Sequence, residues 1–136
     1  MGKMFVILAF LCLFVISCSG SGGETVSGEV DCSSSGYNAI AEAELDEWEE
    51  IITVTLTRFP GNLSPIIRDL ENILGDYKNM AIPDCYHPAH DKFVAGMEYA
   101  LEGVKEFDTT GNVSDKFNLA EAEFTAAQDE LAKLDQ

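Results

Sequence analysis

The densest group of reactive side chains lies at residues 84–91, which read Asp-Cys-Tyr-His-Pro-Ala-His-Asp. This segment holds Cys85 and both histidines of the chain, His87 and His90, which are three residues apart. A thiolate and two imidazoles are ligands that zinc and copper accept. A metal site built from these three residues is therefore one hypothesis, and it requires Cys85 to be a free thiol.

The pattern around the two histidines favours a different interpretation. His90 falls on an apolar stripe with Phe93 and Met97, at helical spacing, whereas His87 falls toward the edge of that stripe. A histidine in such a position is more often a boundary residue of a core than a ligand. We therefore expect no metal here.

Other chemistry has less support in the sequence. No Gly-x-Ser-x-Gly occurs, and the serines are concentrated in residues 19–36 rather than beside His and Asp. The haem-attachment motif Cys-x-x-Cys-His and the Asp-rich calcium loop are both absent. We expect a protein that is not an enzyme and that holds no cofactor.

The elements that position these residues are predicted by hydrophobic periodicity. Apolar residues recur at intervals of three and four over residues 37–59, 63–77, 86–107 and 113–134. The run Ile51 to Leu56 is β-branched, but it keeps the helical register. Four amphipathic helices with short connections predict an all-α fold, an antiparallel up-down four-helix bundle.

Local signals mark the expected helix ends. Ser64 is the predicted N-cap of the second helix, with Pro65 at its first position. Gly111 is expected to help close the third helix, and Val113 to begin the stripe of the fourth.

Charge excludes some classes of partner. The chain has 136 residues with 24 Asp and Glu against 8 Lys and Arg, a formal charge of −16. Such a field repels nucleic-acid phosphates and anionic lipid headgroups, so we expect no nucleic-acid binding. Because 46% of residues are hydrophobic, the chain is expected to fold rather than to remain disordered.

The amino end has the pattern of an export signal. Lys3 precedes thirteen residues without a polar side chain, which is too short to span a bilayer. The residues that follow, Val15-Ile16-Ser17-Cys18, resemble the lipobox of bacterial lipoproteins. The resemblance implies a signal peptide at 1–17, a diacylglycerol on Cys18, and attachment to the cell membrane or outer membrane. An ordinary secretory signal cleaved after Ser19 is the alternative.

A linker is expected between the anchor and the folded domain. Residues 19–36 contain six Ser and five Gly, so 18–36 are predicted to form a flexible tether, with the bundle at 37–136. The reach of such a coil is roughly 23 Å. In the lipoprotein family an Asp after the lipidated Cys retains the protein at the inner membrane. Ser19 occupies that place here, which favours the outer membrane in a two-membrane cell.

The remaining cysteines form a candidate pair. Cys12 lies in the signal peptide, which leaves Cys32 and Cys85 in an exported, oxidising setting. In an up-down bundle both lie at the same end, which favours a disulfide; two free thiols are the alternative. Closing a loop of about 54 residues would stabilise the fold by roughly 4 kcal/mol.

Two functions stay open. The segment Ile82-Pro83-Asp84-Cys85, followed by Met97 and Phe107, resembles a pattern in uncharacterised exported bacterial helical domains, which implies no activity. We expect a lipid-anchored interaction or structural module that meets another envelope protein. The alternative is a carrier that holds a small apolar ligand in the bundle core. That ligand would lie among Phe59, Phe93, Met97, Phe107, Phe117 and Phe124.

Overall fold

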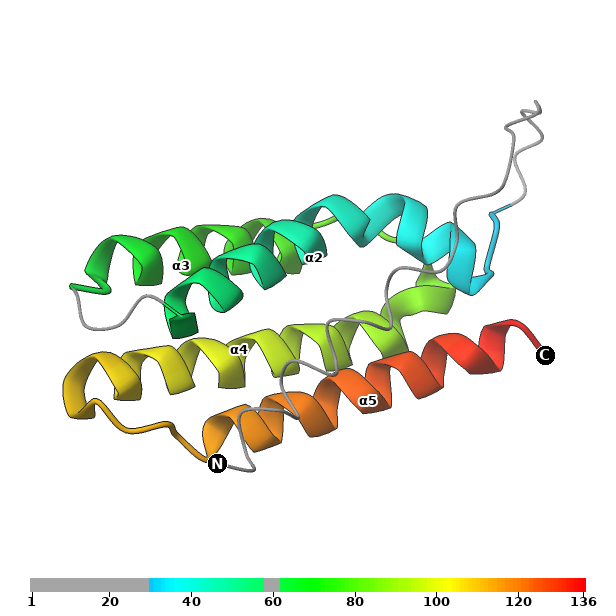
Figure 1. The fold of residues 1–136 in the computed structure, drawn as a ribbon. Coiled ribbons are helices and arrows are strands. Elements are labelled where there is room, and N and C mark those ends of the chain that lie inside the picture. Colours follow the sequence, from blue (N-terminus) through cyan, green and yellow to red (C-terminus); the bar gives the residue numbers. More distant parts are fainter. Residues whose placement is uncertain (1–29, 58–61) are drawn as a thin grey trace.

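The computed structural model describes residues 30–57 and 62–136. Within these ranges the chain forms four α-helices, a short 3-10 helix and no strand, so the predicted all-α class is confirmed (Figure 1). The predicted signal peptide and lipobox, most of the predicted tether, and Phe59 lie outside the described residues. The elements are α2 (Ser34–Thr57), α3 (Ser64–Lys78), η1 (Asp84–Tyr86), α4 (His87–Thr110) and α5 (Lys116–Leu134).

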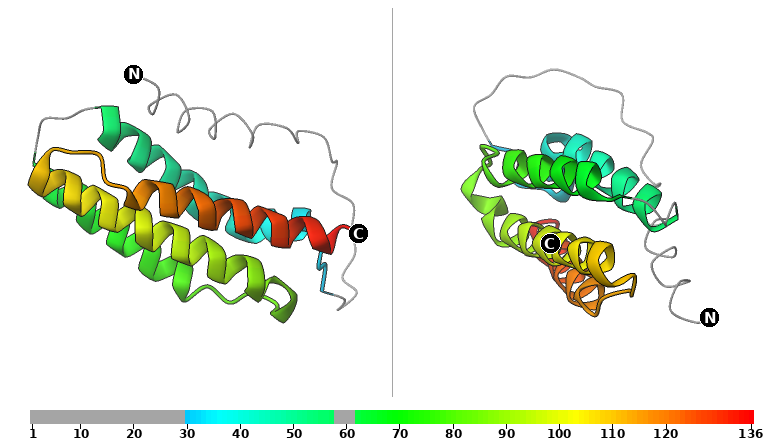
Figure 2. Two further views of the ribbon diagram at one scale, coloured as in Figure 1. Left: turned by 90° about the horizontal axis from the view of Figure 1, so that it is seen from below. Right: turned by 90° about the vertical axis from the view of Figure 1, so that its left-hand side faces the viewer.

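The helices form two layers, with α2 and α3 in one and α4 and α5 in the other (Figures 1 and 2). In Figure 1 the chain runs leftward along α2, returns along α3, runs leftward again along α4 and returns along α5. Each helix packs against the next, and α5 also touches α2. The contact between α4 and α5 is by far the most extensive, while that between α2 and α5 is sparse.

Two glycines allow α4 and α5 to pack closely. A Cβ atom on Gly96 would lie 2.6 Å from the Phe124 ring, and one on Gly103 would lie 3.0 Å from the Phe117 ring. The glycines are seven residues apart, as are the phenylalanines, and the earlier glycine faces the later phenylalanine. The two helices therefore run antiparallel, with each ring packed into the space that a missing side chain leaves.

Lys–Glu ion pairs follow the same antiparallel register. They join α4 to α3 on one side and to α5 on the other. Most of these side chains are largely exposed, so each pair contributes little to stability, and together the pairs favour one register over its neighbours. The pairs are Lys78–Glu98 (2.6 Å), Lys105–Glu71 (2.7 Å), Lys92–Glu123 (3.0 Å) and Lys116–Glu102 (2.7 Å).

The predicted stripes supply most of the core. Phe93, Met97 and Phe107 of α4 are buried, as expected, and Phe117 and Phe124 are partly buried against them. The residues 51–56 are helical, as their register predicted. Other buried side chains come from every helix: Tyr37, Trp48, Leu70, Ile73, Leu74, Tyr77, Leu101, Val104 and Leu131.

The start of α3 differs from its prediction. Ser64 is not the N-cap; Leu63 occupies that position, and no side chain there caps the helix. Instead the Ser64 N–H donates to Asn62 Oδ1 at 3.0 Å, and the Leu63 N–H donates to Asp108 Oδ1 at 3.2 Å. The Asp108 carboxylate at the end of α4 thus accepts a hydrogen bond from the backbone of the N-cap residue, but it does not replace the cap that the Ser64 hydroxyl was expected to provide.

Two other helix starts are shifted. Val113 precedes α5, which begins at Lys116, and it is 65% exposed, so it does not belong to the buried stripe. α2 begins at Ser34, three residues before Tyr37, so the last part of the predicted tether is helical. The end of α4 is as predicted, since Gly111 adopts a left-handed conformation (φ 70°) and its N–H donates to the Phe107 carbonyl at 2.8 Å.

Substituting these glycines tests the packing of α4 against α5. We expect Gly96→Ala to lower the free energy of unfolding by about 1–3 kcal/mol relative to Gly75→Ala, because the new methyl group would overlap the Phe124 ring. Gly75 is also within a helix, but a Cβ there meets nothing within 4 Å. Both variants gain the same helix propensity. Urea unfolding followed by circular dichroism measures the difference, and equal stabilities would contradict the packing.

Candidate functional site

The end of the bundle where the described chain begins is fastened by a disulfide. Cys32 and Cys85 are bonded, with their Cα atoms 6.0 Å apart. The bond joins the segment before α2 to η1, across 53 residues of sequence. The predicted pairing is therefore confirmed, and the Cys85 sulfur is not available as a thiolate ligand.

Two further side chains hold the start of α2 at the same place. The buried Tyr86 hydroxyl lies against the backbone carbonyls of Asp31 and Ser33 and donates its proton to them. The Ser34 N–H donates to Asp135 Oδ1 at 2.9 Å, and hydrogen bonds from Ser34 lower the pKa of that carboxyl. A carboxylate at a helix N-terminus satisfies a free donor and matches the helix dipole. We call Cys32, Cys85, Tyr86 and Asp135 the clasp.

Beside the clasp three polar rings from three helices meet inside the core. The Tyr37 hydroxyl of α2 is hydrogen-bonded to the Tyr77 hydroxyl of α3 and lies 3.1 Å from His90 Nδ1 of α4. Both tyrosines are fully buried, and His90 is 5% exposed. The His90 ring also stacks on Tyr77, with ring centres 4.5 Å apart. We call Tyr37, Tyr77 and His90 the Tyr–Tyr–His cluster.

Burial sets the protonation of this cluster. It raises the pKa of Tyr37 to about 12 and raises that of Tyr77 further, so both remain neutral hydroxyls at physiological pH. It lowers the pKa of His90, an effect that the Tyr77 backbone and Asp91 partly oppose. The imidazole is therefore neutral near pH 7.

The hydrogen bonding of the cluster is incomplete. His90 Nε2 is buried and has no hydrogen-bond partner among the described residues. If Tyr37 donates to Nδ1, the proton on Nε2 has no acceptor; if Nδ1 donates to Tyr37, the Tyr77 hydroxyl proton has none. Each neutral arrangement thus leaves one buried donor unpaired, which costs about 1–3 kcal/mol.

The histidines do not come together as a metal site. His87 is exposed and lies 3.6 Å from Asp84 at the surface, whereas His90 points into the core. Within residues 30–57 and 62–136, no group of three His, Cys, Asp or Glu is placed to hold a metal ion. The hypothetical ligand set of Cys85, His87 and His90 is not assembled, because its sulfur is bonded and its imidazoles lie in different environments.

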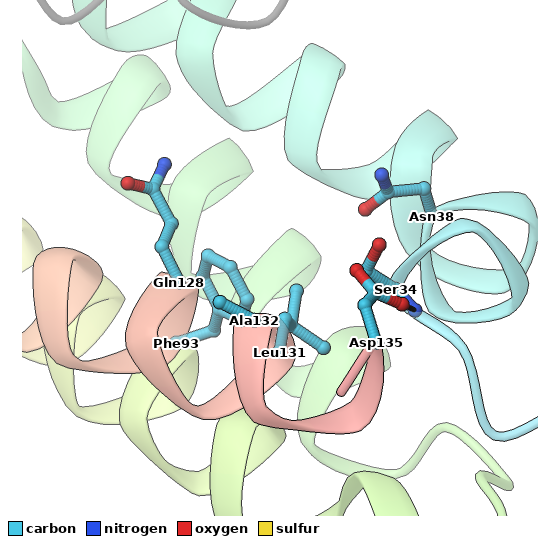
Figure 3. A pocket seen from close by; sticks show the side chains of 7 residues that line it. All are labelled: Ser34, Asn38, Phe93, Gln128, Leu131, Ala132 and Asp135. Carbon is cyan, nitrogen blue, oxygen red and sulfur yellow. Dashed lines mark hydrogen bonds between the residues drawn. The ribbon is translucent and has the colours of Figure 1, made fainter.

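A groove lies near the clasp, between the start of α2 and the end of α5 (Figure 3). Its volume is about 220 Å³. Phe93 and Leu131 form its apolar wall, and Asn38, Gln128 and Asp135 supply polar groups. Small-molecule sites are usually about 300–1,000 Å³, so this groove is small for a carrier.

Sequence reasoning missed the Tyr–Tyr–His cluster, although a signal was present. Tyr37 lies near the start of the first predicted helix, Tyr77 at the end of the second, and His90 near the start of the third. In an up-down bundle these positions share one end. What the periodicity could not show is that their polar atoms face one another.

Comparison of the chain with protein families, with curated proteins and with solved structures finds no match. None of the helices in the described ranges combines the length and hydrophobicity needed to cross a membrane. The role of these residues has to be inferred from their geometry and chemistry.

Removing the Tyr77 hydroxyl tests the cluster. We expect Tyr77→Phe to lower the free energy of unfolding by about 1–3 kcal/mol, because the buried Tyr37 hydroxyl then loses a partner. Tyr99→Phe is the control, since Tyr99 is only partly buried and the variant keeps the ring over which Lys116 Nζ lies, 5.7 Å from its centre. That change should stay within about 0.5 kcal/mol. Equal effects in thermal unfolding would contradict the cluster.

Removing the disulfide tests the clasp. We expect the double variant Cys32→Ser, Cys85→Ser to lose about 2–5 kcal/mol of unfolding free energy, because the unfolded chain gains the freedom of a 53-residue loop. A reducing agent should have the same effect on the unaltered protein and none on the variant. Peptide mass mapping without reduction provides the direct check, and an unlinked Cys85 peptide would refute the bond.

Proposed function

We propose that this chain is a lipid-anchored lipoprotein of the cell envelope. A covalent lipid on Cys18 attaches it to the cell membrane or outer membrane, facing the periplasm or the exterior. Its helical domain acts as a non-catalytic interaction or structural module. The partner is another envelope protein, and no nucleic acid is involved.

The Cys32–Cys85 disulfide is the observation that carries this proposal. Structural disulfides persist in exported proteins and are rare in a reducing cytosol. The bond lies 14 residues after Cys18, so the end of the domain nearest the proposed anchor is also its covalently closed end. Together with the lipobox, it supports export followed by lipidation.

The charges of the domain support a role away from the bilayer surface. All five lysines in the described residues are paired with glutamates. α2 carries six carboxylates between residues 42 and 50 and no Lys or Arg. The net field is negative, so the domain is repelled by anionic headgroups and is attached by lipid rather than by charge.

A module accounts for the core better than a ligand carrier does. Phe117 and Phe124, which would line a cavity in a carrier, pack directly against Gly103 and Gly96. The groove near the clasp is smaller than usual ligand sites. Native mass spectrometry of protein purified from its own membranes separates the two, since a stoichiometric small molecule would favour the carrier.

Labelling with a fatty-acid analogue tests the anchor. We expect the unaltered protein and Cys12→Ala to incorporate the label and to sediment with membranes, because Cys12 lies inside the proposed signal peptide. Cys18→Ala should lose the label and leave the membrane fraction. Label retained by Cys18→Ala would overturn the proposal.

A further inference from the structure

The first described helix, α2, is held differently from the other three. The Lys–Glu pairs join α3, α4 and α5, whereas in the described residues no ion pair reaches α2. Its contact with α5 is sparse. α2 is held in the bundle by three features: the burial of residues such as Trp48, the clasp at its start, and the hydrogen bonds of Tyr37 to Tyr77 and His90.

Protonation of His90 would weaken the polar part of that attachment. The imidazolium has a second N–H, which adds one buried donor to a cluster that already holds an unpaired one, and the Tyr77 backbone offsets this only in part. It would also place a positive charge among buried rings, and no carboxylate is hydrogen-bonded to His90 in the described residues. Exposing His90 to water relieves both penalties.

The titratable groups around the cluster do not compensate that charge. From α2 the groups are Tyr37 and Glu44, which acts on Tyr77 of α3. On α4 itself Asp91 favours the imidazolium, while His87 opposes it. Asp135, which follows α5, acts on Tyr86 of η1, and neither group is among those that shift the pKa of His90.

We infer that the Tyr–Tyr–His cluster is an acid-sensitive latch, in which protonation of His90 releases α2 from α3 and α4 while the Cys32–Cys85 bond keeps the start of α2 attached. The latch is closed above the ordinary histidine pKa of about 6.5, because the released state then binds no extra proton. Below that pH the released state takes up a proton that the closed state resists. One such proton shifts the equilibrium by up to about tenfold per pH unit.

The chain contains its own reporter of this motion. Trp48 is the single tryptophan, lies in the middle of α2 and is 4% exposed. Release of α2 would expose its indole to water and move its emission to longer wavelength. Backbone amides of α2 would exchange hydrogen faster, while those of α4 and α5 would stay protected.

The test uses the full protein purified from cells with its Cys32–Cys85 bond intact, and it compares the protein at pH 7.5 with the protein at pH 5.5. We expect the Trp48 emission to shift to longer wavelength at pH 5.5. We also expect the protection factors of the α2 amides, which correct for the slower intrinsic exchange at low pH, to fall by up to about tenfold, with those of α4 and α5 unchanged. His87→Gln should keep this response, because His87 is exposed. His90→Gln should abolish it.

Two further variants keep the result decisive. If His90→Gln does not fold, His90→Phe retains the stacking on Tyr77 without a titrating group, and it should be insensitive to pH. Glu49→Gln should leave the response intact, although burial and Asp46 raise the pKa of Glu49 beside Trp48. A response that persists without His90, an unaltered protein that does not respond, or equal loss of protection in all helices would overturn the latch.

Discussion

The close approach of α4 and α5 is the interaction on which the rest of the domain depends. Because Gly96 and Gly103 leave room for two phenylalanine rings, the two helices pack along most of their length in one register. That register presents the other sides of α4 to its neighbours. Lysine and glutamate side chains then join it to α3, and His90 reaches Tyr37 of α2. α4 is thus the helix that all three of the others contact.

The acidic excess of the chain has structural uses beyond solubility. Asp108 at the end of α4 accepts a hydrogen bond from the backbone before α3, and Asp135 after α5 does the same at the start of α2. In each case the end of one helix provides a negative charge for the start of another. Glutamates elsewhere pair with lysines across helix boundaries. α2, which has no basic residue, has no ion pair to another helix among the described residues, and most of its carboxylates lie in solvent.

Periodicity was sufficient to predict the four helices. The disulfide was predictable from the expected exported setting together with the shared end of the bundle at which both cysteines lie, since these follow from residue type and spacing. Gly111 was also predictable, since a left-handed helix end is a local preference. The caps from Asp108 and Asp135 were not, because donor and acceptor are 45 and 101 residues apart. Ser64 was wrongly predicted as a cap, because the helix begins one residue earlier than expected and Leu63 occupies the N-cap position. For the Tyr–Tyr–His cluster, the sequence was sufficient to predict that its three rings lie at the same end of the bundle. The direction in which their polar atoms point depends on packing and could not be predicted.

The disulfide also determines how the domain would carry mechanical load. A pulling force applied to the chain before Cys32 is transmitted through the disulfide to Cys85, which lies in η1 immediately before α4. α2 and α3 lie within the closed loop, so the force bypasses them and reaches the helix whose packing is the most extensive. Tension on the chain before Cys32 would therefore not unwind α2. Even if α2 rearranges, the disulfide keeps the rest of the domain covalently connected to that chain.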